Sequence, residues 1–203
     1  MKFSCIIQSF LGDYKGAATN RPTKLIRSVE SIIKQTYQDF EIIVIADGCE
    51  ETFDIIMKAY ENNDKVECYL IKKQPLWSGY ARNFGITKAK GDYIVYLDND
   101  DMYGENHLEK ISSQLNGEEW VWFNDIVLNK RNDKIERKCL IKQKFQCGTS
   151  NICHKRETIV NWNGNAYGLD DWSVVQSLQK YTNSKQINTP EYYVMHLPLK
   201  LDL

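Results

Sequence analysis

The sequence has little net charge and no long apolar run, and these absences exclude several classes of protein. Of its 203 residues, 26 are basic and 27 acidic, so no overall positive field can hold nucleic acid, and we expect no such partner. No apolar stretch approaches the ~18–20 residues that cross a bilayer, and the apolar run of "MKFSCIIQSF" is short for a secretory signal. We therefore expect a cytoplasmic protein, or one attached peripherally at the inner face of the membrane.

Cysteine and glycine motifs are also missing. The six cysteines form no CxxC pair, which argues against a zinc centre, and their spacing does not indicate a disulfide framework. Neither a Walker A loop nor a GxGxxG sequence is present, which excludes two common nucleotide-binding motifs. The chain contains no internal repeat and no evident linker, so its length predicts one domain over residues 1–203.

Short apolar runs alternate with segments of helical periodicity in the first half of the chain. The expected strands are 3–10, 41–47, 66–72 and 93–98, and the expected helices are 22–37, 53–60 and 80–91. Strands that are apolar on both faces and alternate with amphipathic helices predict an α/β fold with a parallel sheet covered on both sides. In the second half we expect a strand pair at 118–129 and 134–142, a loop at 142–156, a helix at 169–181 and a strand at 191–199.

An acidic cluster directly follows the fourth expected strand, in the order Asp98, Asn99, Asp100, Asp101. Its three carboxylates repel one another unless a positive charge lies between them, and Mg²⁺ or Mn²⁺ with oxygen ligands is the simplest relief. A solvated acidic turn before the next helix is the alternative. Ligands of parallel sheets bind beyond the carboxyl ends of the strands, where Asp47 also ends a strand, and this position favours the metal.

Three segments together resemble the family 2 glycosyltransferases. They are "FSCIIQSF", "LIRSVESIIKQTYQDFEIIVIADGCEETF" and "GYARNFGITKAKGDYIVYLDNDD", and the likeness covers roughly residues 1–105. The resemblance implies a GT-A fold, a Rossmann-like, mostly parallel sheet flanked by helices. It also implies a nucleotide-sugar-binding half at 1–105 and an acceptor-side half at 106–203. The activity it implies is metal-dependent, inverting transfer of a sugar from a nucleotide-diphosphate donor to an acceptor hydroxyl.

The same resemblance implies roles on the nucleotide side of the donor. Ser9 and Phe10 are expected near the nucleobase, and Asp47 is expected to accept a hydrogen bond from it. A carboxylate can accept from uracil N3–H, which favours a UDP-sugar. Arg82 and Asn83 match the family's "RN" pair, and Arg82 could contact the pyrophosphate or orient an aspartate. A turn aspartate and a surface ion pair are the structural alternatives for Asp47 and Arg82.

Within the acidic cluster the resemblance divides the roles. It places Asp98 and Asn99 against the donor, makes Asp100 the metal ligand, and leaves Asp101 behind it. His196 corresponds to a histidine that completes the metal site in many members. Imidazole is a suitable ligand for Mn²⁺, although a single histidine on a late strand can equally be structural.

A general base must deprotonate the acceptor hydroxyl as it attacks the anomeric carbon. The family's acidic pair matches "GLDDW", which makes Asp171 the expected base and Asp170 its supporting neighbour, with Trp172 available to stack on the acceptor. Two aspartates in a first helical turn are also what the helix dipole favours. The loop 148–151 is expected to shape the acceptor pocket.

Two other functions remain open on the same scaffold. A sugar-1-phosphate nucleotidyltransferase would need a glycine-rich, arginine-containing loop after the first strand, and "FLGDYKGAATNR" does not have that pattern. A non-catalytic nucleotide-sugar or glycan-binding module would need neither the intact acidic cluster nor a base.

Overall fold

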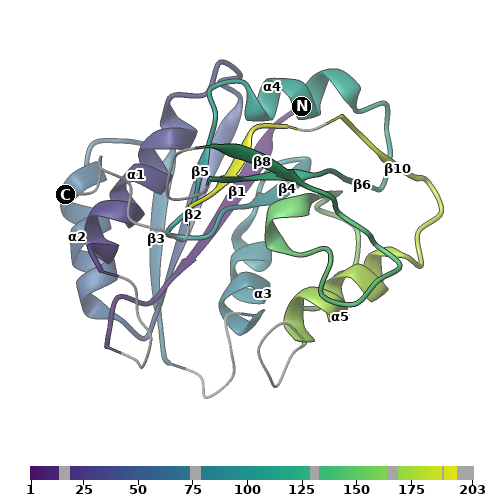
Figure 1. Cartoon of the computed structure of the whole chain (residues 1–203). Helices are drawn as coiled ribbons and strands as arrows, with labels where there is room; N and C mark the ends of the chain where they lie inside the picture. The colour runs from purple at the N-terminus through teal and green to yellow at the C-terminus, as the bar shows by residue number, and fades with distance from the viewer. Residues whose placement is uncertain (14–18, 74–78, 129–132, 164–168, 189, 196–203) are drawn as a thin grey trace.

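A seven-stranded sheet lies at the centre of the protein (Figure 1). The computed structural model describes residues 1–13, 19–73, 79–128, 133–163, 169–188 and 190–195. The strand order is β10-β6-β9-β4-β1-β2-β3. In chain order these strands are β1 (Phe3–Ser9), β2 (Phe40–Asp47), β3 (Val66–Ile71), β4 (Tyr93–Tyr96), β6 (Trp120–Trp122), β9 (Ile152–Lys155) and β10 (Ser184–Gln186).

The first four strands are mutually parallel, as expected from their buried, β-branched sequences. β1 pairs with β2 on one side and β4 on the other, and β2 pairs with β3. The carboxyl ends of β1, β2 and β4 therefore meet at one edge of the sheet. The expected mixed α/β fold with a covered, mostly parallel sheet is confirmed.

Alternate residues of the central strands enter two separate cores. From β1, Phe3, Cys5 and Ile7 join the helices α1 (Arg21–Ile33), α2 (Glu50–Tyr60) and α4 (His107–Gln114). Ile6 points to the other face, which is covered by α3 (Gly79–Lys88) and α5 (Leu169–Leu178). This two-sided burial explains the continuous apolar runs in the sequence.

The second half of the chain departs from the expected pattern at two places. The run 118–129, expected as one strand, divides into β6 of the central sheet and β7 (Asp125–Leu128) of a second sheet. The stretch 142–156, expected as a loop, ends in a 3-10 turn (Thr149–Asn151) and β9. β9 lies between β4 and β6 and runs antiparallel to both. His154 of β9 is buried, and its Nε2 forms a hydrogen bond with the Tyr96 hydroxyl at 2.7 Å. The polar residue at this position therefore belongs to a buried strand and not to an exposed loop.

The second sheet has the order β5-β11-β7-β8. Its other strands are β5 (Met102–Tyr103), β8 (Lys134–Arg137) and β11 (Tyr192–Val194). β7 and β8 form the expected antiparallel pair, and β11 falls within the expected late strand. β5 and β10 were not expected from the sequence. None of the helices described is long and apolar enough to span a membrane.

Candidate functional site

The candidate site residues come together where β1, β2 and β4 end, beside the start of α5. At this edge the turns after the three strands are joined by side chains. Asn99 Nδ2 donates to Ser9 Oγ at 2.9 Å, which ties the end of β1 to the acidic cluster. Ser9 Oγ also lies 3.5 Å from Thr52 Oγ1 on α2. Ser9 and Asn99, both expected on the donor side, are therefore neighbours.

Asp47, at the end of β2, has one carboxylate oxygen paired and one available. The side chain is buried, and Lys73 Nζ lies 2.5 Å from its Oδ2. Oδ1 is also buried and has no hydrogen-bond partner in the described part of the chain. Lys73 Nζ lies 4.4 Å from the centroid of the Phe10 ring, so Phe10 and Asp47 share one cation. A buried carboxylate oxygen without a donor is costly, and a ligand N–H would satisfy it.

Lys73 is a residue that sequence reasoning missed. It follows the edge strand β3 by two positions, and β3 pairs in parallel register with β2, Ile71 opposite Asp47. One signal in the sequence could have indicated Lys73: it is a basic residue just beyond the carboxyl end of a strand expected to be parallel to β2. Gly48 allows the approach, because a Cβ there, at φ +65°, would lie 2.2 Å from Lys73 Cβ.

The acidic cluster is held from two sides. From α1, Ser28 Oγ donates to the carbonyl of Asp101 at 2.6 Å, and Arg27 donates to the carbonyl of Asp100. From the last described strand, the Tyr192 hydroxyl donates to Asp101 Oδ2 at 3.0 Å and accepts from the backbone N–H of Asp98 at 3.1 Å. The turn is thus fixed before any ligand arrives, which a solvated acidic turn would not require.

Asp101 is buried, whereas Asp98 and Asp100 of the same turn are partly exposed. Asp101 is 1% exposed, and its Oδ1 accepts from the backbone N–H of Met195 at 2.7 Å. Burial, with the charges of Asp100 and Asp98, raises the pKa of Asp101 well above its usual value. Asp101 therefore anchors the turn, and the donor role of Asp98 and the metal role of Asp100 stay predictions.

Arg82, on α3, connects the two acidic groups of the site. Its Nη2 lies 2.8 Å from Asp98 Oδ1, and its Nη1 lies 3.4 Å from Asp170 Oδ2. The guanidinium is 5% exposed and stacks over the ring of Trp162, 4.7 Å from its centroid. Burial acts to lower the pKa of Arg82, but the carboxylates around it hold that pKa above its usual value. The surface ion pair considered for Arg82 is therefore wrong, because the side chain is a buried bridge.

Asp171 begins α5 next to this bridge. Burial raises the pKa of Asp171 to about 6; Arg82 opposes the rise, and Asp170 and Asp98 add to it. Thr149 Oγ1 donates to its Oδ1 at 3.1 Å. A Cβ on Gly148 would lie 2.9 Å from its Oδ2, so a larger residue there would require the Asp171 carboxylate or the loop to shift. A carboxylate with a pKa near 6 is suited to accept a proton near neutral pH.

Contacts of two further expected site residues are visible in the described structure, and a third residue lies outside it. Asn83 Nδ2 donates to Asn161 Oδ1 and to the carbonyl of Trp162, both at 3.1 Å, and its Oδ1 accepts from Trp162 N–H at 3.0 Å. These contacts favour a structural role, and donor contact by Asn83 stays a prediction. Trp172 is half-buried and packs against the core on the α5 side. His196 lies outside the described residues.

The residues present fit a divalent cation of the Mg²⁺ type. In the part of the chain that is described, no group of three or more acidic, histidine or cysteine side chains is placed to hold a metal ion. Mg²⁺ needs no such group, since it commonly takes one or two carboxylates with phosphate oxygens and water. Asp98 and Asp100 offer such carboxylates, partly exposed, at the ligand edge.

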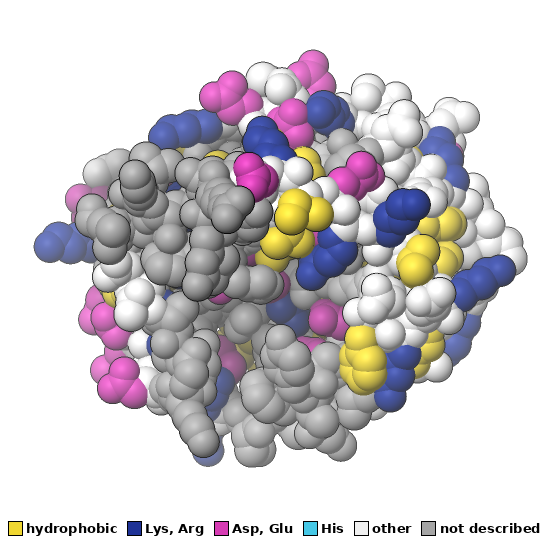
Figure 2. Space-filling model, viewed as in Figure 1, with side chains coloured by type: hydrophobic (Ala, Val, Ile, Leu, Met, Phe, Trp, Pro, Cys, Tyr) yellow, Lys and Arg dark blue, Asp and Glu magenta, His cyan; other side chains and the backbone are white. Residues whose placement is uncertain are grey.

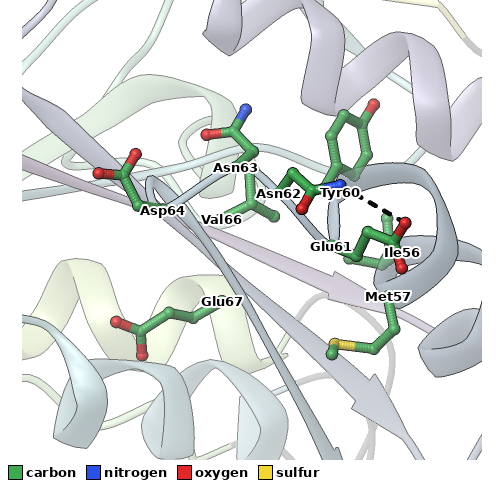
Figure 3. A pocket seen from close by; sticks show the side chains of 9 residues that line it. All are labelled: Ile56, Met57, Tyr60, Glu61, Asn62, Asn63, Asp64, Val66 and Glu67. Atoms are coloured by element: carbon green, nitrogen blue, oxygen red, sulfur yellow. Dashed lines mark hydrogen bonds between the residues drawn. The ribbon is translucent and has the colours of Figure 1, made fainter.

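An open depression of about 480 Å³ lies elsewhere (Figure 3). It is formed by the end of α2, the turn after it and the start of β3, with Tyr60, Asp64 and Val66 among its walls. Because β3 begins there and ends at the site edge, the depression is at the opposite end of the strand from Asp47. It plays no part in the arrangement above.

Comparison with known proteins identifies the family of this chain. The family model described as "Glycosyl transferase family 2" matches residues 17–155, which include the acidic cluster and Arg82. The chain belongs to glycosyltransferase family 2. It is 39% identical over 90 residues to an uncharacterized glycosyltransferase of Rickettsia bellii, covering 44% of this chain and 13% of that protein. It is 37% identical over 91 residues to glycosyltransferase GlyG of Streptococcus pneumoniae, covering 45% and 30%.

The fold is similar to that of a solved structure despite low sequence identity. The structure of S. aureus TarS 1-349 in complex with UDP-GlcNAc superimposes with a TM-score of 0.76 at 15% identity, over 96% of this chain and 58% of that chain. The expected GT-A fold is thereby confirmed. The chain spans less than a third of the length of the two sequence relatives above and about three fifths of the TarS chain.

Proposed function

We propose that this family 2 chain is an inverting glycosyltransferase that uses a UDP-sugar and a divalent metal. The observation that carries the proposal is the buried Arg82, which joins Asp98 on the donor side to Asp170 on the acceptor side. A single cation in this position sets the distance between the donor and the base. It also lies where charge develops as the sugar–phosphate bond breaks.

The nucleobase end supports uridine. Uracil N3–H would donate to the unpaired Oδ1 of Asp47, and Phe10 and Ser9 flank the same corner. The TarS structures were obtained with UDP-GlcNAc and with UDP, which is consistent with this class of donor in a related fold.

Asp98 and Asp100 would hold the metal together with the diphosphate, and His196 is a further proposed ligand. When bound, the metal would neutralise charge on the leaving diphosphate. Lys24 of α1 is a second source of positive charge nearby. Its ammonium is fully buried and has no hydrogen-bond partner in the described part of the chain, and Ser28, one turn further along α1, holds the acidic cluster.

Asp171 is the proposed base. It takes the proton from the acceptor hydroxyl while that oxygen forms a bond to the anomeric carbon, and the bond from that carbon to the phosphate oxygen breaks to release UDP. Attack from the side opposite the leaving group inverts the anomeric centre. Thr149 orients the base by its hydrogen bond to Asp171 Oδ1. Asp170 acts through its ion pair with Arg82. Trp172 is the proposed acceptor contact.

Titration calorimetry and a transfer assay together test the proposal. UDP should bind in the presence of Mn²⁺, and Asp47→Ala should weaken it by about 10- to 100-fold, the value of a hydrogen bond to a charged group. Asp54→Ala, an exposed aspartate on α2, serves as the control. UDP-sugar hydrolysis or transfer should then require Mn²⁺. Binding without turnover across many acceptors would favour a binding module, and unchanged affinity in Asp47→Ala would reject the uracil contact.

A further inference from the structure

The hairpin strand β8 and the loop after it carry a concentration of positive charge. Residues 134–146 contain five basic side chains and one acidic side chain, in a chain whose net charge is −1. One of the five, Arg137, is matched by the buried Asp125, with Nε 2.9 Å from Oδ1. The other four are exposed lysines: Lys134, Lys138, Lys142 and Lys144. We call this segment the basic hairpin surface.

Large hydrophobic side chains are interspersed with these lysines. Ile135 is 52% exposed, Leu140 is 39% exposed and Phe145 is 59% exposed. Figure 2 shows hydrophobic and basic side chains alternating on the right-hand part of the visible face. Aliphatic side chains gain nothing from water or from a hydrophilic polyanion, so this mixture is characteristic of a surface that meets lipid.

The loop presents Phe145 outward at a cost in backbone energy. Phe145 has φ +65°, a left-handed conformation that is rare for a residue with a bulky side chain. The two ends of the loop are fixed, because Cys139 and Cys147 are each 4% exposed and pack in the core beneath. Leu140 N–H also donates to the carbonyl of Gln146 at 3.0 Å. Strain held by well-anchored neighbours is a feature of binding sites.

We propose that the basic hairpin surface binds the protein to an anionic bilayer. The lysines contact the lipid headgroups, and Phe145, Leu140 and Ile135 enter the interface. The charge favours an anionic rather than a neutral surface, and the exposed hydrophobic residues favour a bilayer over a soluble polyanion. Gly148 and Thr149, which touch Asp171, directly follow this surface, so a docked bilayer would lie beside the proposed acceptor side. The inference does not depend on the proposed transfer reaction.

Vesicle flotation of the 203-residue chain tests the charge requirement. The protein should bind vesicles with about 30% phosphatidylglycerol and should not bind pure phosphatidylcholine. Lys138→Glu with Lys142→Glu should lower partitioning by about 30-fold or more, since each lysine near an anionic surface contributes about fivefold. Lys34→Glu with Lys58→Glu makes the same change in charge at two exposed positions, one just after α1 and one on α2, and should retain binding.

A second variant separates docking from folding. Phe145→Gly removes the aromatic ring and also relieves the left-handed backbone, so vesicle binding should fall while the melting temperature holds or rises. Met57→Ala, at an exposed hydrophobic residue of α2, should bind vesicles as the parent does. Full vesicle binding by both hairpin variants would overturn the proposal. So would binding to soluble polyphosphate without binding to anionic vesicles, which would make the surface a polyanion site.

Discussion

At the scale of single residues, Asp171 combines a hydrogen bond from Thr149, partial burial and a raised pKa. Asp171→Asn should lower transfer by about 10² to 10⁴, the usual contribution of a general base, without weakening UDP binding. Initial rates and calorimetry measure the two effects. The control is Asp54→Asn, at an exposed position of α2. Transfer within twofold of the parent would rule Asp171 out as the base.

The same substitution should affect stability in a way that depends on pH. Burial raises the pKa of Asp171 to about 6, above its value in the unfolded chain, so the folded state is stabilised when the group is protonated. This contribution is complete below the unfolded pKa and is lost as the pH rises through about 6. Asp171→Asn should therefore be more stable than the parent at about pH 7.5, and the difference should shrink towards pH 4. A structural role would instead make the variant less stable at every pH.

Single residues also show why the site was only partly predictable. Strand ends and family motifs mark Asp47, Arg82 and Asp171 in the sequence, and their chemical roles stay predictions. Lys73 was missed because its partner lies on another strand, and pairing register is not written in local sequence. Tyr192 was missed because its hydroxyl reaches Asp101 across 91 positions of chain.

At the scale of elements, Asp101 ties the acidic turn to the end of β11. Asp101→Ala should lower the free energy of unfolding by about 2–4 kcal/mol, because it leaves the Tyr192 hydroxyl and the Met195 N–H buried without their acceptor. Urea unfolding measures the change. Asp39→Ala, at an exposed position, should cost less than about 0.5 kcal/mol. A loss for Asp101→Ala as small as that control would show that β11 is held by other contacts.

The loop before β9 meets α5 through a glycine. Gly148→Ala should place a methyl group 2.9 Å from Asp171 Oδ2, so the carboxylate or the loop must move. We expect transfer to fall by about 10- to 100-fold, as for a displacement of about 1 Å in a reacting group. UDP affinity should remain. Gly117→Ala is the contrast: at φ +89° with no atom near its Cβ, it should cost stability and leave transfer unchanged. Equal transfer rates for the two variants would remove Gly148 from the site.

The elements of the first half were predicted well, and those of the second half less well, for a physical reason. β1, β2 and β4 are central and buried on both faces, so their sequences are continuously apolar. β9 is also central but carries His154 and directly follows Asn151, and these residues form hydrogen bonds to Tyr96 and Phe123 respectively. Buried polar residues whose hydrogen bonds come from distant parts of the chain cannot be told from exposed loop residues in the sequence alone. The division of 118–129 between two sheets depends on which partner each half finds.

At the scale of the whole molecule, acid sensitivity is set partly by two buried histidines. Burial lowers the pKa of His107 to about 3 and that of His154 to about 4. Each therefore stays neutral in the fold while the unfolded chain takes up a proton below about pH 6.5. Their contribution to stability is present above that pH and is lost as the pH falls.

His107 allows a direct test, because both ring nitrogens are buried without hydrogen bonds in the described structure. It stacks on Tyr103, with centroids 3.8 Å apart. His107→Phe should raise the free energy of unfolding, and the gain should be about 2 kcal/mol larger at pH 5 than at pH 7.5, the proton-uptake term for a group of unfolded pKa 6.5. Urea titrations at both pH values measure it. A gain independent of pH would mean that the imidazole does not stay neutral in the fold.

In the proposed reaction, the Arg82 guanidinium between Asp98 and Asp170 would couple the binding of the donor to the activation of the acceptor. A donor diphosphate that binds beside Asp98 would compete for Arg82. The attraction between Arg82 and the carboxylates at the start of α5 would then be weaker. Asp171 then becomes a stronger base once the donor is in place. The pH profile of kcat, which reports the loaded enzyme, should be displaced to higher pH than that of kcat/KM, which reports the free one. In the proposed reaction, donor binding and activation of the acceptor would be thermodynamically linked through Arg82, which both groups share.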